Sequence, residues 1–429
     1  MHQVLSMNGL RDKVVLRTDG GLKTGRDIVM AAMLGADEYG IGTSALVAMG
    51  CIMVRQCHSN TCPVGVCTQR DDLRAKFEGT PDKVVQLFTH VAEEVREILA
   101  SLGFKHLDEV IGRTDLLTQV SRGDAALDDL DLNPVLVQAE ANGSSCYRGG
   151  PGRVQVADTL DAQMVKDAET ALQSGGKMQL TYNIENTARA IGTRLSSHIV
   201  RRFGMNGLRE GQITAILRGT AGQSLGAFAV QGLRLDVIGD GNDYVGKGLS
   251  GGMITIRPSP SASYVAEQNT IIGNTVLYGA TSGLLLANGQ AGERFAVRNS
   301  GASAIIEGCG SNGCEYMTGG EVVILGRTGS NFGAGMTGGM AFIHDKDGEF
   351  LSQVNPETLH ISKLSTGYWK DYLEERVALH ASETDSAHAK RLLNNWEVES
   401  GNFWHVVPTE VLGLLPQPVA DNEIPVRSA

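Results

Sequence analysis

The stretches Met253-Ile254-Thr255-Ile256 and Glu321-Val322-Val323-Ile324 are short apolar runs rich in β-branched residues, and each directly follows a glycine. Runs of this kind are typical of strands with buried side chains. A glycine precedes such a run at six places, Gly232, Gly252, Gly283, Gly301, Gly320 and Gly339. Successive glycines of this set are 20, 31, 18, 19 and 19 residues apart, so the pattern is a repeat with a period close to 19.

The one long interval contains the run Pro258-Ser259-Pro260-Ser261-Ala262-Ser263, which has the composition of a loop. It fits a repeat that carries an insertion of roughly a dozen residues. One apolar strand per repeat predicts a β-solenoid, in which each coil buries its inward face on the next and glycines occupy the tight corners. The apolar runs argue against a glycine-rich disordered linker.

The composition sets limits on the class of protein. A chain of 429 residues can hold two or three domains, and its 54 glycines exceed the average usage of about 7%. The net charge of -11 and the absence of a basic run with interleaved aromatic residues argue against a nucleic-acid partner. The first ten residues do not read as a signal peptide and no segment approaches about 20 apolar residues, so we expect no membrane and a cytoplasmic location.

The N-terminal region has the pattern of alternating strands and helices. Val14-Val15-Leu16 predicts a strand that ends at Asp19-Gly20-Gly21, followed by a helix over 24–34 and a second strand over 39–41. Gly42-Thr43-Ser44 then opens another helix, and the apolar spacing between Val84 and Leu102 predicts a long amphipathic helix ended by Gly103. Two strand-ending loops about twenty residues apart correspond to one βα repeat of a barrel.

These two glycine loops admit two interpretations. Glycine lets backbone N–H groups approach phosphate oxygens closely, and the positive ends of the helices that follow both loops would favour an anion. Glycine turns also end many strands that bind no ligand. The residue types alone leave a phosphate cradle and a purely structural pair of turns open.

Four of the seven cysteines, Cys51, Cys57, Cys62 and Cys67, lie within 17 residues in a C-x5-C-x4-C-x4-C pattern. In a chain without a secretion signal, this density favours ligation over disulfides. The spacing differs from the C-x2-C pairs of common structural zinc sites, and Pro63 after Cys62 is reminiscent of ferredoxin-type sites. An iron-sulfur cluster, a zinc site with His58 as an extra ligand, and free thiols all remain open on spacing alone.

Three blocks resemble the large subunit of glutamate synthase: Arg17 to Asp27, Gly40-Ile41-Gly42-Thr43, and Gly50 to Gly65. The resemblance implies the last two strands of an FMN-binding barrel, with Gly20, Gly21, Gly42 and Thr43 at the FMN phosphate and Asp19 orienting the loop. It also implies a 3Fe-4S cluster held by Cys51, Cys57 and Cys62. Cys67 falls outside that ligand set.

The region from Gln179 to His344 is similar to the C-terminal β-helix domain of the same family, through blocks such as Gly219 to Ser224 and Gly239 to Gly248. The implied fold class is α/β plus all-β, the C-terminal end of a (β/α)8 FMN-binding barrel followed by a β-helix. The expected domains are 1–140 for the barrel end with its cysteine segment, 141–178 for a linker, 179–345 for the GXGXG β-helix, and 346–429 for a partly helical tail. Cys309 and Cys314 are expected to be packing residues.

The function implied by the resemblance is that of part of a glutamate synthase, an oxidoreductase acting on CH-NH2 donors. Such an enzyme makes L-glutamate from 2-oxoglutarate and glutamine-derived ammonia by reduction at FMN, with electrons relayed through the 3Fe-4S cluster. The implied partners are the remaining large-subunit domains and either an NADPH-oxidising FAD/iron-sulfur small subunit or ferredoxin. The amidotransferase nucleophile and the early barrel strands are not among these residues, so we expect no activity without them. A non-catalytic iron-sulfur electron-transfer or scaffold subunit is the alternative.

Overall fold

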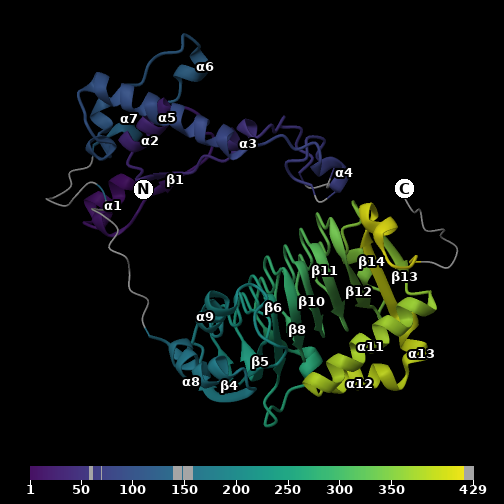
Figure 1. Cartoon of the computed structure of the whole chain (residues 1–429). Helices are drawn as coiled ribbons and strands as arrows, with labels where there is room; N and C mark the ends of the chain where they lie inside the picture. The colour runs from purple at the N-terminus through teal and green to yellow at the C-terminus, as the bar shows by residue number, and fades with distance from the viewer. Residues whose placement is uncertain (58–60, 69, 139–146, 148–157, 420–429) are drawn as a thin grey trace. The chain divides into compact units, whose positions relative to one another are not determined.

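A computed structural model describes residues 1–57, 61–68, 70–138, 147 and 158–419 (Figure 1). The chain divides into two compact units, Met1–Cys57 with Thr61–Val156, and Ala157–Ala429. The coarse expectation of a mixed α/β chain with a large strand-rich domain is confirmed. Three features predicted from the sequence lie outside the described residues. They are most of the boundary within 141–156, the extra zinc ligand His58, and the end of the tail at 420–429.

The first unit is built on two helices that pack together, α2 (Gly25–Met33) and α5 (Pro81–Leu102). Both helices were predicted; Thr24, expected as the first helical residue, is the N-cap of α2, and Gly103 ends α5 as expected. The first predicted strand is displaced: β1 spans Arg17–Thr18 rather than 14–16, and it pairs in parallel with β2 (Glu38–Tyr39). The other helices are α1 (His2–Met7), η1 (Arg11–Lys13), α3 (Thr43–Ala48), α4 (Asp71–Arg74), η2 (Leu107–Val110), η3 (Thr114–Leu116), α6 (Ala125–Asp128) and α7 (Asn133–Leu136).

The close approach of α5 to α2 depends on the first residue of α2. A Cβ atom added at Gly25 would lie 2.7 Å from the Cβ of Glu94 and 2.8 Å from the carbonyl oxygen of Val91, both on α5. Only glycine therefore allows this contact. The apolar face of α5 is incompletely covered, since Phe88 and Leu102 remain about 40% exposed (39% and 42%).

The second unit contains a 12-stranded sheet in which the strands of the main path follow chain order from β3 to β12, while β7 and β9 lie off this path and β14 lies between β12 and β13. From β3 to β12 the strands of the main path run parallel, and the last two strands add antiparallel at the far end. Figure 1 shows these strands stacked one behind the next, with α8 and α9 at one end of the stack. The strands are β3 (Met178–Ile184), β4 (Ile213–Ala221), β5 (Leu233–Gly241), β6 (Ser250–Arg257), β7 (Thr270–Ile272), β8 (Ser282–Ala287), β9 (Gln290–Ala291), β10 (Ser300–Ile306), β11 (Thr318–Ile324), β12 (Gly338–His344), β13 (Leu359–Lys363) and β14 (Phe403–Pro408).

Side chains alternate between the two faces of this sheet. Residues such as Ile254, Val322 and Ile324 belong to a long core cluster on the inward face. Their neighbours Val323 and Phe342 contact a second cluster that includes Trp369 of α11. Both faces of β8 to β12 are thus buried, which explains why these strands read as continuous apolar runs.

The segments on either side of the sheet contain helices. Helix α8 (Leu160–Ser174), which falls within the range expected to be a linker, packs on β3 and on α9 (Thr193–Phe203). The range expected to be a partly helical tail contains α10 (Phe350–Gln353), α11 (Gly367–Thr384), α12 (Ala387–Asn394), α13 (Trp396–Glu399), η5 (Ser400–Asn402) and η6 (Thr409–Leu414). It also supplies β13 and β14, which extend the sheet. The inserted loop after β6 contains η4 (Ala266–Gln268).

The turns between strands repeat one unusual backbone conformation. Each of six turns has three residues with positive φ at alternate positions, as in Tyr244, Gly246 and Gly248. The amides of Tyr244 and Gly248 donate to carbonyl oxygens of the following turn at 2.9 and 2.8 Å, while the amide of Gly246 donates to Leu225 of the preceding turn at 2.8 Å. The amides of these alternate residues therefore bind the following turn, the preceding turn and the following turn again.

The six glycines that mark the sequence repeat are all required by the structure. Four of them, Gly232, Gly283, Gly320 and Gly339, have positive φ. A Cβ at Gly301 would lie 2.0 Å from the carbonyl oxygen of Thr281 in the preceding coil, and one at Gly252 would lie 2.9 Å from the Cβ of Ala229. The sequence placed these glycines at tight corners, but five of them lie inside strands, near the starts of β6, β8, β10, β11 and β12. The expectation of corners is wrong for these five, and glycine is needed there because the preceding segment approaches closely.

Replacing Gly301 by Ala is expected to lower the free energy of unfolding by about 1–3 kcal/mol, because the added methyl group overpacks the contact between coils. Gly367→Ala is the matched control, since a Cβ there would meet no atom within 4 Å. Urea denaturation followed by circular dichroism measures both variants. Equal stability of the two would contradict the steric role of Gly301.

Candidate cofactor site

The structure brings the two predicted glycine loops together at the carboxyl ends of β1 and β2. The parallel register pairs Thr18 with Tyr39, and the amide of Gly40 donates to the carbonyl oxygen of Thr18 at 2.7 Å. The hydroxyl of Ser44 lies 3.5 Å from the carbonyl oxygen of Leu22. Loop residues 19–22 and 40–44 are therefore neighbours, as one βα repeat requires.

The space beside these loops suits a ligand that approaches the backbone closely. Gly20 and Gly21 have φ values of +94° and +78°, and a Cβ added at Gly20, Gly21 or Gly42 would meet nothing within 4 Å. Packing thus does not explain the absence of side chains at these three positions. Open backbone with left-handed glycines fits the close approach of a phosphate group.

The two helices beside the loops differ in what their N-terminal amides contact. At α2, the Asp27 carboxylate accepts hydrogen bonds from the amides of Lys23 and Thr24, both at 2.9 Å, and Glu94 accepts from Gly25 at 2.7 Å. The hydrogen bond from the Lys23 amide is the largest of the causes that lower the pKa of Asp27 below its usual value. The amides of Lys23, Thr24 and Gly25 therefore already have acceptors within the chain, and an anion beside α2 would have to compete for them.

At α3, by contrast, no side chain in the described part of the chain caps the helix, which begins at Thr43 after Gly42. Gly42 and Thr43 are both exposed. The phosphate interpretation thus depends on Gly20, Gly21 and the start of α3. Asp19 is also exposed, and its carboxylate makes no recorded hydrogen bond or ion pair with the described residues, so a loop-orienting role for Asp19 has no contact to support it.

A buried ion pair that the sequence pattern did not indicate holds the starts of both strands. The Arg11 side chain is fully buried, and its Nη2 lies 2.8 Å from Asp37 Oδ2 and 2.9 Å from the carbonyl oxygen of Gly35. The same Asp37 oxygen accepts the amide of Leu16 at 2.7 Å. Since Leu16 precedes β1 and Asp37 precedes β2, this pair fixes the strands that carry the glycine loops.

The cysteine segment begins eight residues after Thr43. Cys62 is buried, Cys57 is exposed, and Cys51 and Cys67 are half-buried. Burial tends to raise the pKa of the Cys62 thiol, but hydrogen bonds from the amides of Cys67, Val64 and Val66 bring it below its ordinary value. Backbone amides directed at a sulfur atom are typical of thiolate ligands, so Cys62 suits a cluster.

The contacts among the four thiols differ from the expected ligand set. Burial, followed by hydrogen bonds to Cys57 and Cys62, raises the pKa of Cys67 to about 12. Cys51 is contacted by the amide of Met53 at 3.4 Å, with no contact to the other three thiols recorded among the described residues. Within 1–57, 61–68 and the other described ranges, no three His, Cys, Asp or Glu side chains form a ready metal site.

Comparison with known proteins shows which family the chain belongs to. Residues 1–105 match the family model described as the conserved region in glutamate synthase, and residues 161–409 match the GXGXG motif model. The chain belongs to the glutamate synthase large-subunit family. It is 63% identical to the glutamate synthase [NADPH] large chain of Azospirillum brasilense and 48% identical to ferredoxin-dependent glutamate synthase 2 of Synechocystis. These alignments cover 98% and 95% of this chain.

The same alignments cover 28% and 26% of the two glutamate synthases, and 20% of the glutamate synthase [NADH] of Schizosaccharomyces pombe. The chain therefore spans about a quarter of the length of its curated relatives. Where the structure describes the chain, no helix is long and apolar enough to cross a membrane.

Arg11→Met is expected to weaken the first unit by about 3–5 kcal/mol, because it leaves the Asp37 carboxylate without its buried partner. Arg17→Met is the control, since Arg17 of β1 forms an exposed ion pair with Glu38, the residue opposite it on β2. Amide hydrogen exchange of α2 measures the effect. A similar, small change in exchange for both variants would show that Arg11 is not what holds the strands.

Proposed function

We propose that this chain is the part of a glutamate synthase that supplies one side of the FMN site, the 3Fe-4S ligands and a β-helix domain. The observation that carries the proposal is the pairing of β1 with β2, which brings the loop of Gly20 and Gly21 beside the loop of Gly42, nine residues before Cys51. The whole protein would make L-glutamate from 2-oxoglutarate and glutamine-derived ammonia, as an oxidoreductase acting on CH-NH2 donors.

With this function we propose the domain limits expected from the sequence, which are 1–140, 141–178, 179–345 and 346–429. The parallel order of β3 to β12 and the stacked turns support a β-helix over 179–345. The β1-α2-β2-α3 order supports the end of a (β/α)8 barrel in the first unit. Two paired strands cannot close a barrel by themselves, so the proposal requires further strands from the rest of the synthase.

The backbone of this chain would bind the FMN phosphate. The backbone at Gly20 and Gly21 has open space where a side chain would stand, and the uncapped start of α3 at Gly42 and Thr43 adds partial positive charge. Asp27 and Glu94 would keep the loop and α2 in place by occupying the amides of Lys23 and Gly25. When bound, FMN would supply the reducing chemistry and the cluster a path for single electrons.

Cys51, Cys57 and Cys62 are the proposed cluster ligands, in keeping with the family resemblance. The amides around Cys62 support its role as a ligand, because they stabilise negative charge on sulfur. Cys67 would then sit beside the cluster, and the contacts of Cys67 with Cys57 and Cys62 make it the one rival for a ligand position. The rest of the large subunit, and either an NADPH-oxidising subunit or ferredoxin, are the proposed partners, since both kinds of electron source occur in the names of similar proteins.

Anaerobically purified protein is expected to contain about three irons per chain. Cys51→Ser, Cys57→Ser and Cys62→Ser should each lose most of this iron, while Cys67→Ser should retain it. Iron analysis and EPR measure the outcome, and Cys309→Ser, a buried thiol of the second unit, is the control. Retention of iron by Cys51→Ser with loss in Cys67→Ser would replace Cys51 by Cys67, and stoichiometric zinc without iron would overturn the cluster.

The polypeptide of these 429 residues alone is expected to bind FMN weakly and to form no glutamate from glutamine. Co-expression with the remainder of a large subunit should restore flavin binding. In that complex, Gly21→Val should weaken FMN retention by about tenfold or more, since a branched side chain would enter the open space and oppose a φ of +78°. Gly103→Val has a similar φ and also open surroundings, so it controls for backbone strain. Flavin fluorescence after denaturation measures retention, and strong FMN binding by the 429-residue chain alone would refute the first expectation.

A further inference from the structure

The far end of the sheet in the second unit is closed by β14, which lies between β12 and β13 and runs antiparallel to both. On the face that α11 covers, His405 lies opposite Phe342, and Phe403 lies opposite His344. The rings of His405 and Phe342 are stacked with centroids 4.4 Å apart, and the centroids of His344 and Phe403 are 4.9 Å apart. Trp369 of α11 also contacts His405, with ring centroids 4.8 Å apart. These rings join the closing strand to the stack and to α11.

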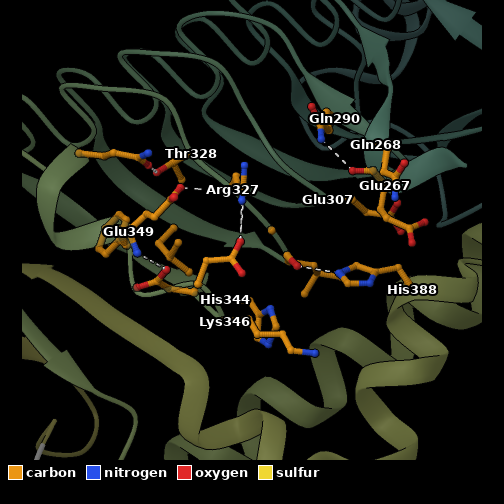
Figure 2. Close-up of a pocket in the computed structure, with 17 residues that line it drawn as sticks. Glu267, Gln268, Gln290, Glu307, Arg327, Thr328, His344, Lys346, Glu349 and His388 are labelled. Carbon is orange, nitrogen blue, oxygen red and sulfur yellow. Dashed lines mark hydrogen bonds and ion pairs between the residues drawn. The ribbon is translucent and has the colours of Figure 1, made fainter.

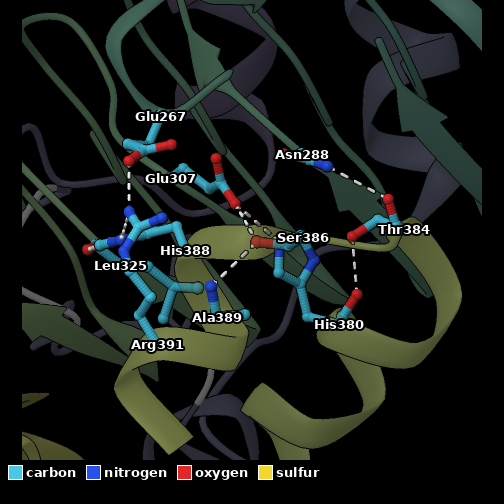
Figure 3. A network of polar contacts seen from close by, with 10 residues as sticks. All are labelled: Glu267, Asn288, Glu307, Leu325, His380, Thr384, Ser386, His388, Ala389 and Arg391. Carbon is cyan, nitrogen blue, oxygen red and sulfur yellow. Dashed lines mark hydrogen bonds and ion pairs between the residues drawn. The ribbon is translucent and has the colours of Figure 1, made fainter. Parts of the chain in front are cut away.

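Three histidines among the described residues of the second unit are buried, namely His344, His380 and His405. Two of them lie beside a carboxylate. His344 lines a pocket (Figure 2), and its Nε2 lies 2.9 Å from Glu399 Oε2. His380 belongs to the network in Figure 3, where its Nε2 lies 3.6 Å from Glu307 Oε1. Each of these two imidazoles therefore has a negative charge within reach if it takes up a proton.

His405 differs from the other two, because no carboxylate is recorded beside it among the described residues. It is 1% exposed, and neither of its ring nitrogens has a hydrogen-bond partner in the described part of the chain. From β13, Ser362 lies directly opposite His405, and His360 lies two residues away on the same face. Burial, followed by the charge of His360, lowers the pKa of His405 to about 3. A proton on His405 would therefore be a buried charge without an acceptor.

The acidic groups on the other elements around His405 are engaged elsewhere or exposed. Glu321 of β11 accepts a hydrogen bond from Tyr372 of α11, and its carboxylate lies 3.4 Å from Nε of Arg376. Helix η6, which packs against β14, carries Glu410, and this residue is exposed. Neither element therefore offers His405 a buried carboxylate that is not already engaged.

The aromatic rings around His405 offset only part of the cost of such a charge. An imidazolium between Phe342 and Trp369 would gain a cation–π attraction. Removing an unpaired charge from water costs more than this attraction returns. The closed joint between β12 and β14 therefore requires a neutral His405.

We propose that the joint between β12 and β14 is an acid-sensitive closure, in which uptake of a proton by His405 releases β14, together with β13 and α11, from the stack. An opened joint exposes the imidazole to water, where it takes up a proton near its ordinary pKa of about 6.5. The closure is therefore fully stable above this pH and weakens as the pH falls below it. Release leaves the edge of β12 unpaired, and such an edge can pair with another chain. The closure does not depend on the proposed cofactor residues.

Amide hydrogen exchange of the 429-residue chain at pH 7 and pH 5, expressed as protection factors, tests the proposal. His405 should raise the opening constant of β14 about 25-fold between these two pH values, because its pKa changes from about 3 to about 6.5 on opening. His405→Leu should lose this part of the rise. His198→Leu, which removes a half-exposed imidazole of α9, should keep it. The same rise in wild type and His405→Leu would overturn the proposal, and an equal loss of protection in β4 and β5 would overturn local release.

Ser362→Asp provides a second test, which remains decisive if His405→Leu fails to fold. It places a carboxylate directly opposite His405, where the carboxylate can pair with an imidazolium. The rise in the opening constant of β14 between pH 7 and pH 5 should then be at least about fivefold smaller than in wild type. Ser382→Asp, at an exposed serine of α11, is the matched control and should behave as wild type. An unchanged rise in Ser362→Asp would show that charge on His405 does not open the joint.

Discussion

The hydrogen bonds between stacked turns are the constraint on which the second unit depends. Twelve of the eighteen positive-φ positions in the six turns are not glycine, and each such residue costs on the order of 1 kcal/mol in isolation. An isolated turn cannot recover this cost, because the amides of its positive-φ residues point away from its own carbonyls. A neighbouring turn above and below accepts them, as Arg294 and Ala296 illustrate with bonds to Ser311 and Val276 at 2.8 and 2.9 Å. The coils are therefore stable only as a stack.

A stack of this kind needs an end at which the open amides and apolar faces are covered. At the first end, Ala190 donates to Gln223 at 2.9 Å and Ile191 accepts from Gly226 at 2.8 Å, so the segment before α9 acts as an additional turn. At the other end the amide of Phe332 donates to Gln353 at 3.0 Å, and Phe350 packs edge-on against Phe332 with ring centroids 5.6 Å apart. Both ends are closed by segments outside the repeat, which explains why the helices belong to this unit.

The sequence predicted the parts of this fold that depend on local pattern. Gly301 and Gly320 could be found because a missing side chain repeats at a fixed interval, and α5 because its apolar residues recur every three or four positions. The left-handed Tyr244 and Arg294 could not be found, since nothing in a tyrosine or an arginine marks positive φ; only the neighbouring turn requires it. The joining of β14 to β12 was missed for a similar reason, because a pairing across about sixty residues leaves no local signal.

For the candidate site, too, the sequence predicted what depends on local pattern and missed what depends on contacts between distant residues. Spacing along the chain indicated that Gly20 and Gly42 end neighbouring strands, and the parallel pairing bears out their proximity. What the sequence could not show is which groups compete for the surrounding backbone. Glu94, about seventy residues away, takes the Gly25 amide that an anion would otherwise use, and this contact exists only because α5 lies against α2.

The two units differ in how many contacts hold their strands in place. In the second unit the same kinds of bond recur from turn to turn, so the loss of one contact is shared by its neighbours. In the first unit the strands carrying the glycine loops are two residues long and rely on Arg11 and Asp37. A short sheet held by one buried ion pair is the kind of region that opens at low free energy, and ligand-binding loops are commonly drawn from such regions. The open backbone at Gly20 and Gly21 lies in this region of the first unit.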